Sequence, residues 1–308
     1  MWRYSWLDSI PCSITLFQLA LNFWLAATWQ TRPLLHNLLF LPLCLFLFCY
    51  NGLVASHNFV HTPWFKLSWL NRLYLMLNSI NIGLPQAHYA HEHLLHHRYN
   101  NDRPDAYGHT QDPTSTFAGG KNNQHEGMLS YCFLGPFHLD LLGSFREICQ
   151  RGGTGQLALE LIACCLGFMA YALLSWQYVV LMLVPTLYLG WVLEHIENYY
   201  EHFGGEPELR YANSTSYYGR LYNWLFCNEG YHQEHHLRPN MHWLKRPQNH
   251  QELAAKLAQV DRVILRLPPC LAWLEHRRLA ERWATKPLQA RILPKARLDD
   301  SLAERIAS

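Results

Sequence analysis

The stretch LLHNLLFLPLCLFLFCYNGLVASHNFVH, from Leu34 to His61, joins a long apolar run directly to a pair of histidines. The part from Leu34 to Ser56 is long enough to cross a bilayer, since a transmembrane helix needs about 20 mostly apolar residues. A run of the same kind precedes it, from Pro11 to Trp29. Only the residues from Gln30 to Pro33 separate the two runs. The sequence therefore predicts a hairpin that crosses the membrane and returns.

A second pair of apolar runs lies in the middle of the chain, with almost no polar turn between its members. These runs extend from Leu157 to Trp176 and from Val179 to Leu193. The segment from Leu67 to Pro85 is apolar but interrupted by polar residues, and it fits a short pair of spans, a re-entrant segment or an interfacial helix. The polar stretch from about Tyr99 to Gln156 is typical of loops and short helices.

We therefore expect an all-α integral membrane protein with about four transmembrane helices in two hairpins, interfacial helices and a cytoplasmic helical cap that carries the histidines. The whole chain, 1–308, is expected to form a single domain. Its parts are two transmembrane hairpins (10–56 and 157–193), two cytoplasmic histidine-box regions (57–156 and 194–250) and a basic C-terminal tail (251–308).

The distribution of Lys and Arg predicts the orientation in the membrane. Positive residues gather in the polar part from Glu194 to the C-terminus, which includes the tail, in the segments KRP, EHRRLAERW, ARILPKAR and ERIAS. Because Lys and Arg favour the cytoplasmic side, this tail is expected to be cytoplasmic. Each hairpin returns the chain to the side from which it came. Both termini and every histidine cluster are therefore expected on the cytoplasmic face.

Composition narrows the class of protein further. The aromatic share of 14% suits a protein that contacts a membrane interface. A formal net charge of +2, without a basic stripe interleaved with aromatics, argues against nucleic acid as a partner. The nine cysteines form no CxxC pair, so we interpret them as small buried hydrophobes in a reducing environment. An iron-sulfur or rubredoxin-type electron donor would then be another protein.

Histidines are unusually numerous, 19 in all, and many of them cluster in order along the chain. The first cluster is an HxxxH box, and the second and third are HxxHH boxes. One further histidine precedes the third box within NYYEHFG. The candidate catalytic and metal-binding residues are His57, His61, His93, His96, His97, His202, His232, His235 and His236.

The spacing within the boxes is that of metal ligands on helices. Residues three and four apart share a helix face, so each box is expected to direct two or three imidazoles toward one point. Imidazole suits iron, copper, zinc and nickel. Nine nitrogen ligands are too many for one ion with four to six ligands and about right for two ions. A binuclear site is the simplest interpretation of the pattern.

Several other polar residues lie close enough to the boxes to orient the ligands, as outer partners of metal sites do. Three of them are histidines, namely His88, His91 and His195. Four are acidic residues that could accept the second imidazole N–H or could be ordinary solvated charges, namely Glu92, Glu194, Glu201 and Glu234. The isolated histidines are expected to lie outside the site, namely His36, His109, His125, His138, His242, His250 and His276.

From His57 to about Trp243, the three ordered boxes and the hairpins between them resemble the superfamily of membrane fatty acid desaturases, fatty acid hydroxylases and alkane monooxygenases. The segments NEGYHQEHHLRP (228–239) and EHLLHH (92–97) are similar to the third and second boxes of desaturases, including the sphingolipid type. NYYEHFG (198–204) and QDPTS (111–115) are similar to the additional histidine motif and the acidic-proline segment of alkane monooxygenases, whose second box has one more residue.

This resemblance implies two Fe ions held almost wholly by histidine, O2 as co-substrate, and electrons from a separate ferredoxin, rubredoxin or cytochrome. It implies oxidation of an unactivated C–H bond in a fatty acyl or other lipid-like hydrocarbon chain, by desaturation or hydroxylation. An alkane-type terminal hydroxylase and an alkene-forming oxidative decarboxylase remain alternatives.

Two other classes of protein fit the pattern less well. A membrane metal transporter should hold its histidines at mid-bilayer depth, whereas the boxes here lie beyond the apolar runs. A zinc hydrolase is disfavoured because the HExxH motif is absent and the number of histidines exceeds the needs of a zinc site.

Overall fold

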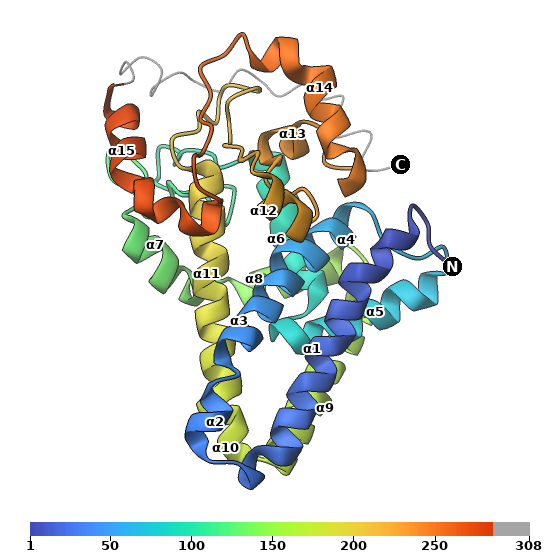
Figure 1. Cartoon of the computed structure of the whole chain (residues 1–308). Coiled ribbons are helices and arrows are strands. Elements are labelled where there is room, and N and C mark those ends of the chain that lie inside the picture. Colours follow the sequence, from blue (N-terminus) through green and yellow to red (C-terminus); the bar gives the residue numbers. More distant parts are fainter. Residues whose placement is uncertain (286–308) are drawn as a thin grey trace.

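A computed structural model describes residues 1–285 of the chain. Throughout this part the regular elements are helices, and no β-strand is present (Figure 1). The all-α prediction is therefore confirmed for these residues. The end of the predicted basic tail, with its ARILPKAR and ERIAS segments, lies outside the described residues.

Four helical segments are long and apolar enough to cross a membrane, as predicted. They form two hairpins, Trp6–Thr31 with Leu34–His61 and Thr154–Leu174 with Trp176–His202. The second and fourth segments extend further than the apolar runs indicated, because the helix continues without a break into the histidines. His57, His61 and His202 thus lie on the last turns of these two segments.

The first hairpin contains the main helices α1 (Ser9–Thr28) and α3 (Leu41–Cys49). A π-helical segment, η3 (Tyr50–Ser56), follows α3 and leads into the short helix α4 (His57–His61). The second hairpin contains α9 (Thr154–Leu174) and α11 (Val184–His202). Figure 1 shows the two hairpin turns, at α2 (Leu34–Leu38) and α10 (Trp176–Tyr178), together at one end of the molecule.

The segment from Leu67 to Pro85, whose form the sequence left open, folds as one helix, α5 (Ser68–Ile82). Its 15 residues are too few to span a bilayer. The helix ends at Gly83, which adopts a left-handed conformation (φ 77°) that glycine tolerates best. Pro85 then introduces α6 (Gln86–Tyr99), the helix that carries the second histidine box.

The remaining described helices form a cap at the end of the molecule opposite the hairpin turns (Figure 1). α8 begins where the side chain of Asp140 accepts the backbone N–H of Gly143. The third box lies on the short helix α13. The bounds of the cap helices are α7 (Met128–Leu134), α8 (Leu141–Gln150), α12 (Arg220–Leu225), α13 (His232–Leu237), α14 (Arg246–Leu257), η7 (Pro269–Glu275) and α15 (His276–Thr285).

Buried apolar side chains between the spans hold the two hairpins together. One cluster includes Leu25, Trp29, Tyr171 and Met182, which come from both hairpins. Large exposed hydrophobics such as Leu173 (81% exposed) face outward from the same helices, as expected for a surface covered by lipid. The spans and their outward apolar surface identify an integral membrane protein.

Candidate metal centre

The eight histidines of the boxes and His202 converge at the junction of the cap and the spans. They form two groups, and in each group one nitrogen from every ring lies within 4.8 Å of the others. The first group, called the five-histidine cluster, consists of His57, His61, His93, His97 and His235. The second group, called the four-histidine cluster, consists of His96, His202, His232 and His236.

The two HxxHH boxes divide their histidines between the clusters, which differs from the expectation that each box points at one place. On α6, His93 and His97 are four residues apart and join the five-histidine cluster, while His96 joins the other. Neighbouring residues on a helix point about 100° apart, so His96 and His97 face different clusters. On α13, His235 belongs to the five-histidine cluster, while His232 and His236 belong to the four-histidine cluster.

The five-histidine cluster is tightly packed. The Nε2 atoms of His61 and His93 are 2.8 Å apart, and the Nε2 atom of His97 lies 3.1 Å from each of them. The Nε2 atom of His235 lies 2.7 Å from that of His57 and 3.0 Å from that of His97. Five imidazoles therefore direct the same nitrogen toward one small volume.

The four-histidine cluster repeats this arrangement beside it. The Nε2 atom of His232 lies 3.1 Å from that of His202 and 3.0 Å from that of His236. The Nε2 atom of His96 is buried and has no hydrogen-bond partner. Its ring centroid lies 4.6 Å from that of His202 and 5.0 Å from that of His236. This unpaired nitrogen points to a ligand that the chain itself does not supply.

Electrostatics favour neutral rings with available lone pairs at most of the clustered histidines, whereas Asp112 raises the pKa of His96 against the effect of burial. Burial, followed by repulsion from neighbouring cationic groups, holds the pKa of His93, His97 and His235 well below the usual value. The pKa of His232 and of His236 is lowered in the same way. A neutral imidazole carries one N–H, so three mutually close Nε2 atoms cannot all be satisfied by protons. A cation would satisfy them together, and the donor set fits a metal that accepts imidazole.

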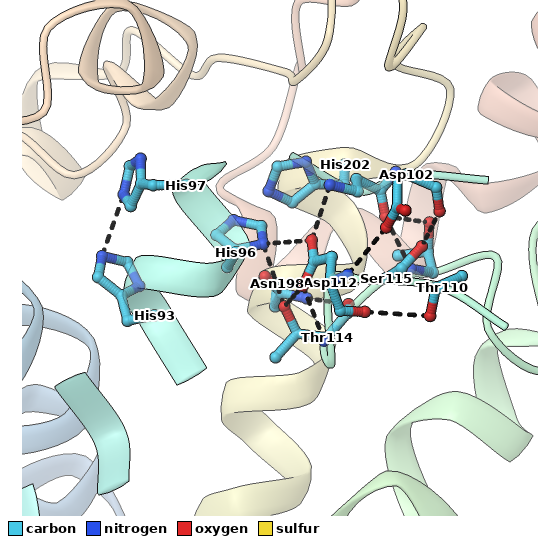
Figure 2. Close-up of polar contacts among 12 residues, drawn as sticks. His93, His96, His97, Asp102, Thr110, Asp112, Thr114, Ser115, Asn198 and His202 are labelled. Carbon is cyan, nitrogen blue, oxygen red and sulfur yellow. Dashed lines mark hydrogen bonds and ion pairs between the residues drawn. The ribbon is translucent and has the colours of Figure 1, made fainter. Parts of the chain in front are cut away.

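Acidic residues contact the outer side of the four-histidine cluster. Figure 2 shows His96 joined to Asp112, whose Oδ2 atom lies 2.8 Å from His96 Nδ1. Burial tends to raise the pKa of Asp112, but His96 and backbone N–H groups lower it to about 2. The carboxylate of Glu201 lies 3.2 Å from His232 Nδ1, without the alignment of a hydrogen bond. Such partners fix ring orientation and increase the basicity of a ligand.

The outer side of the five-histidine cluster has a different composition. The carboxylate of Glu229 lies 3.5 Å from His57 Nδ1 and forms an ion pair of 2.8 Å with Arg246. The buried Arg246 guanidinium also donates a hydrogen bond to Asn58 and lies 3.4 Å from His235 Nδ1. Burial raises the pKa of Glu229 to about 7 although Arg246 opposes this shift.

Three of these outer residues were not among the acidic and basic groups expected from the sequence. Asp112 lies in the QDPTS segment, which was noted for its resemblance alone, and Glu229 lies three residues before His232. Arg246 begins α14 and has no motif that could have identified it. Their roles arise from contacts between segments far apart in the chain.

Among the four acidic residues that the sequence suggested, only Glu201 faces a histidine of either cluster within ion-pair distance. Glu92 accepts a hydrogen bond from Ser144. Glu234 accepts hydrogen bonds from Ser216 and Tyr218 and pairs with His250. Glu194 has a buried carboxylate oxygen without a hydrogen-bond partner.

The other histidines lie outside both clusters. His195 directs Nδ1 toward the carbonyl oxygen of Trp191, and His91 lies 3.8 Å from Glu147. The ring of His88 contacts Phe145. The isolated histidines are likewise absent from the clusters, namely His36, His109, His125, His138, His242, His250 and His276.

Curated relatives include sphingolipid desaturases. The sphingolipid delta(4)-desaturase of Candida albicans is 28% identical over 214 residues, which cover 63% of this chain and 56% of that protein. The sphingolipid delta(4)-desaturase/C4-monooxygenases of Bos taurus and Mus musculus are each 29% identical, covering 70% and 61% of this chain. The matches span 66% and 57% of these two relatives, so the chain covers less than two thirds of each relative's length.

No solved structure is significantly similar to this chain. The family model for fatty acid desaturases matches residues 27–268. This range contains all nine clustered histidines, the second hairpin and the part of the first hairpin that follows residue 26. This match covers most of the chain, and the chain therefore belongs to the fatty acid desaturase family.

Proposed function

We propose that the protein is a non-haem di-iron oxidoreductase that uses dioxygen to oxidise an unactivated C–H bond in a fatty acyl or similar lipid chain. The observation that carries this proposal is the pair of adjacent histidine clusters at the cap ends of the membrane spans. Membership in the fatty acid desaturase family supports a lipid substrate and an iron-dependent reaction.

Five histidines would hold one iron ion and four would hold the other, namely the members of the two clusters. When bound, the two ions supply the activation of dioxygen and the removal of hydrogen from the substrate. The chain contributes orientation, because α6 and α13 each carry ligands of both ions and so fix one ion relative to the other. Asp112 orients His96 through its Nδ1 atom, which leaves Nε2 directed into the four-histidine cluster.

Burial of the clusters keeps bulk water away from the reacting carbon. His57, His96, His202, His232 and His235 are all less than 9% exposed. The clusters also lie where the spans end, so a lipid chain between the helices would reach them without leaving the membrane. This position fits an apolar substrate better than a water-soluble one.

Orientation and electron supply are also part of the proposal. The two hairpin turns contain one basic residue, Arg32, whereas Lys and Arg are frequent in the cap, and by the positive-inside rule this difference supports a cytoplasmic cap and cytoplasmic termini. The nine cysteines are free and scattered, so an external ferredoxin, rubredoxin or cytochrome would deliver the electrons at this face.

Mass spectrometry of lipids from cells that express the wild type or the His235→Ala variant tests this function. Cells receive medium- and long-chain substrates under heavy-isotope dioxygen. A product of the wild type that carries labelled oxygen identifies a hydroxylase, and a product that lacks two hydrogens without label identifies a desaturase. Identical lipids in both strains would contradict the proposal.

A further inference from the structure

Three glutamates of α11 point toward the interior at intervals of three and four residues, which places them on one face of the helix. Glu201 lies beside His232, and Glu197 accepts a hydrogen bond from the hydroxyl of Tyr222. Glu194 is also buried, with 7% exposure, but its Oε1 atom has no hydrogen-bond partner. It is the member of this row that lies furthest from His202 and nearest to the membrane.

The backbone of the second span makes room for the Glu194 carboxylate. A Cβ atom added to Gly52 would lie only 1.6 Å from Glu194 Oε1, so a larger residue at this position would displace the carboxylate. Gly52 lies in the π-helical segment η3, five residues before His57. π-Helical turns inside longer helices occur frequently at functional sites, where they alter the local helix path.

A further polar group connects this place to the five-histidine cluster. The hydroxyl of Tyr89 donates a hydrogen bond of 3.1 Å to the carbonyl oxygen of Gly52. The ring of Tyr89 stacks on His93, with centroids 5.9 Å apart. Gly52, Tyr89 and Glu194 therefore form a small polar region between the clusters and the apolar part of the spans.

An ionisable side chain without a partner inside a membrane protein is costly and usually marks a site for a ligand. A plain hydrocarbon chain beside Glu194 would leave its oxygen unsatisfied. A lipid with a hydroxyl or amide N–H near the carbon that reaches the irons would donate a hydrogen bond to it. An acceptor that is satisfied only by such a lipid discriminates strongly against analogues without the donor.

We propose that Glu194 is a specificity-determining residue, whose carboxyl oxygen accepts a hydrogen bond from a hydroxyl or amide group of the lipid substrate close to the oxidised carbon. This inference rests on the proposed function for the identity of the neighbouring oxidising site. It adds a subsite for the polar part of the substrate, formed by Glu194 over Gly52.

The test compares binding of two lipids of equal chain length to the full-chain protein without dioxygen. One lipid is an N-acylated long-chain amino alcohol, and the other is a fatty acid methyl ester without a donor. Brominated chains quench tryptophan fluorescence and report binding. The variants are Glu194→Leu, which removes the acceptor, and Glu194→Gln, which keeps an acceptor oxygen. Glu147→Leu removes a half-exposed carboxylate on α8 and serves as the control.

The wild type, Glu147→Leu and Glu194→Gln are expected to prefer the amino alcohol lipid by about tenfold. Glu194→Leu is expected to lose this preference while binding of the methyl ester changes less than about threefold. Gly52→Ala should act like Glu194→Leu, because its methyl group displaces the carboxylate. Equal binding of both lipids by the wild type, or an unchanged preference in Glu194→Leu, would overturn the inference.

Product analysis in air separates this inference from the proposed function. If the preference depends on Glu194 but neither lipid is oxidised, the subsite stands and the oxidase proposal fails. If either lipid is oxidised at the same relative rate by the wild type and Glu194→Leu, and binding shows no preference, the oxidase proposal stands and the subsite is wrong.

Discussion

The five-histidine and four-histidine clusters use the same side chain but are supported in different ways. In the four-histidine cluster, Asp112 and Glu201 approach the outer nitrogens of His96 and His232. In the five-histidine cluster the nearest carboxylate, Glu229, lies 3.5 Å from His57 and is already paired with Arg246. The cluster with fewer imidazoles thus has more carboxylate support.

This difference suggests a division of roles. A carboxylate bonded to a ligating imidazole increases its basicity and strengthens metal binding. Asp112 can do this for the four-histidine cluster, which has one nitrogen ligand fewer. Glu229 instead balances the charge of the buried Arg246, so its main contribution is to the stability of the fold. The following predictions, from the largest effect to the smallest, test this division.

Removing one imidazole from either cluster should have the largest effect. We expect His61→Ala and His236→Ala each to lower the rate of lipid oxidation at least about 1,000-fold, or about 4 kcal/mol of transition-state stabilisation, because the proposed reaction requires both ions. His109→Ala, at an exposed loop histidine, is the control. Product formation per iron-loaded enzyme is the measurement. Full activity in either cluster variant would show that only one cluster takes part.

Glu229→Gln should destabilise the protein whether or not metal is bound. The substitution leaves the guanidinium of Arg246 buried without its counter-charge, at a cost of about 3 kcal/mol. Thermal unfolding in detergent, with iron-loaded and iron-free protein, measures this loss. A loss of stability that appears only in the iron-loaded protein would assign Glu229 to the metal and contradict the division of roles.

Asp112→Asn should weaken iron binding at the four-histidine cluster. Loss of an outer carboxylate usually lowers metal affinity about 10- to 100-fold, and the five-histidine cluster should keep its ion. The matched control is Asp105→Asn in the same loop, since Asp105 accepts backbone N–H groups without touching a histidine side chain. Competition with a chelator measures the two affinities. An equal loss of affinity for both ions, or no loss for either ion, would contradict the proposed difference between the two clusters.

His250→Ala should have the smallest effect. Its imidazole pairs with Glu234 but is about one third exposed and belongs to neither cluster. We expect a loss of about 0.5–1 kcal/mol in the free energy of unfolding and activity within about twofold of the wild type. Chemical denaturation and product assays measure both values. A large loss of iron in this variant would mean that the site extends beyond the nine clustered histidines.

The architecture could be predicted from the sequence because it depends on local patterns. Apolar runs such as Leu34 to Ser56 identify membrane helices by length alone, and box spacing identifies candidate ligands. The ends of the spans were less predictable. The helix continues through His57 to His61 because the cap covers these residues. Hydropathy alone predicts that the span ends at the last apolar residue.

The internal order of the site could not be read from the sequence. The HxxHH pattern separates the directions of His96 and His97 by about 100° but does not show which histidines each one joins, since this depends on where α11 and α13 lie in space. The pairing of Arg246 with Glu229 is also tertiary, as it joins the start of α14 to the segment before α13. Long-range contacts of this kind leave no periodic signal in the chain.

The iron content of the purified protein tests the central claim most directly. Metal-free protein is reconstituted with Fe2+ without oxygen, and iron per chain is counted for the wild type, His61→Ala and His236→Ala. The account predicts two irons per wild-type chain and about one in each variant, lost from a different cluster. One iron or none in the wild type, or two irons in both variants, would contradict a binuclear site formed by the nine histidines.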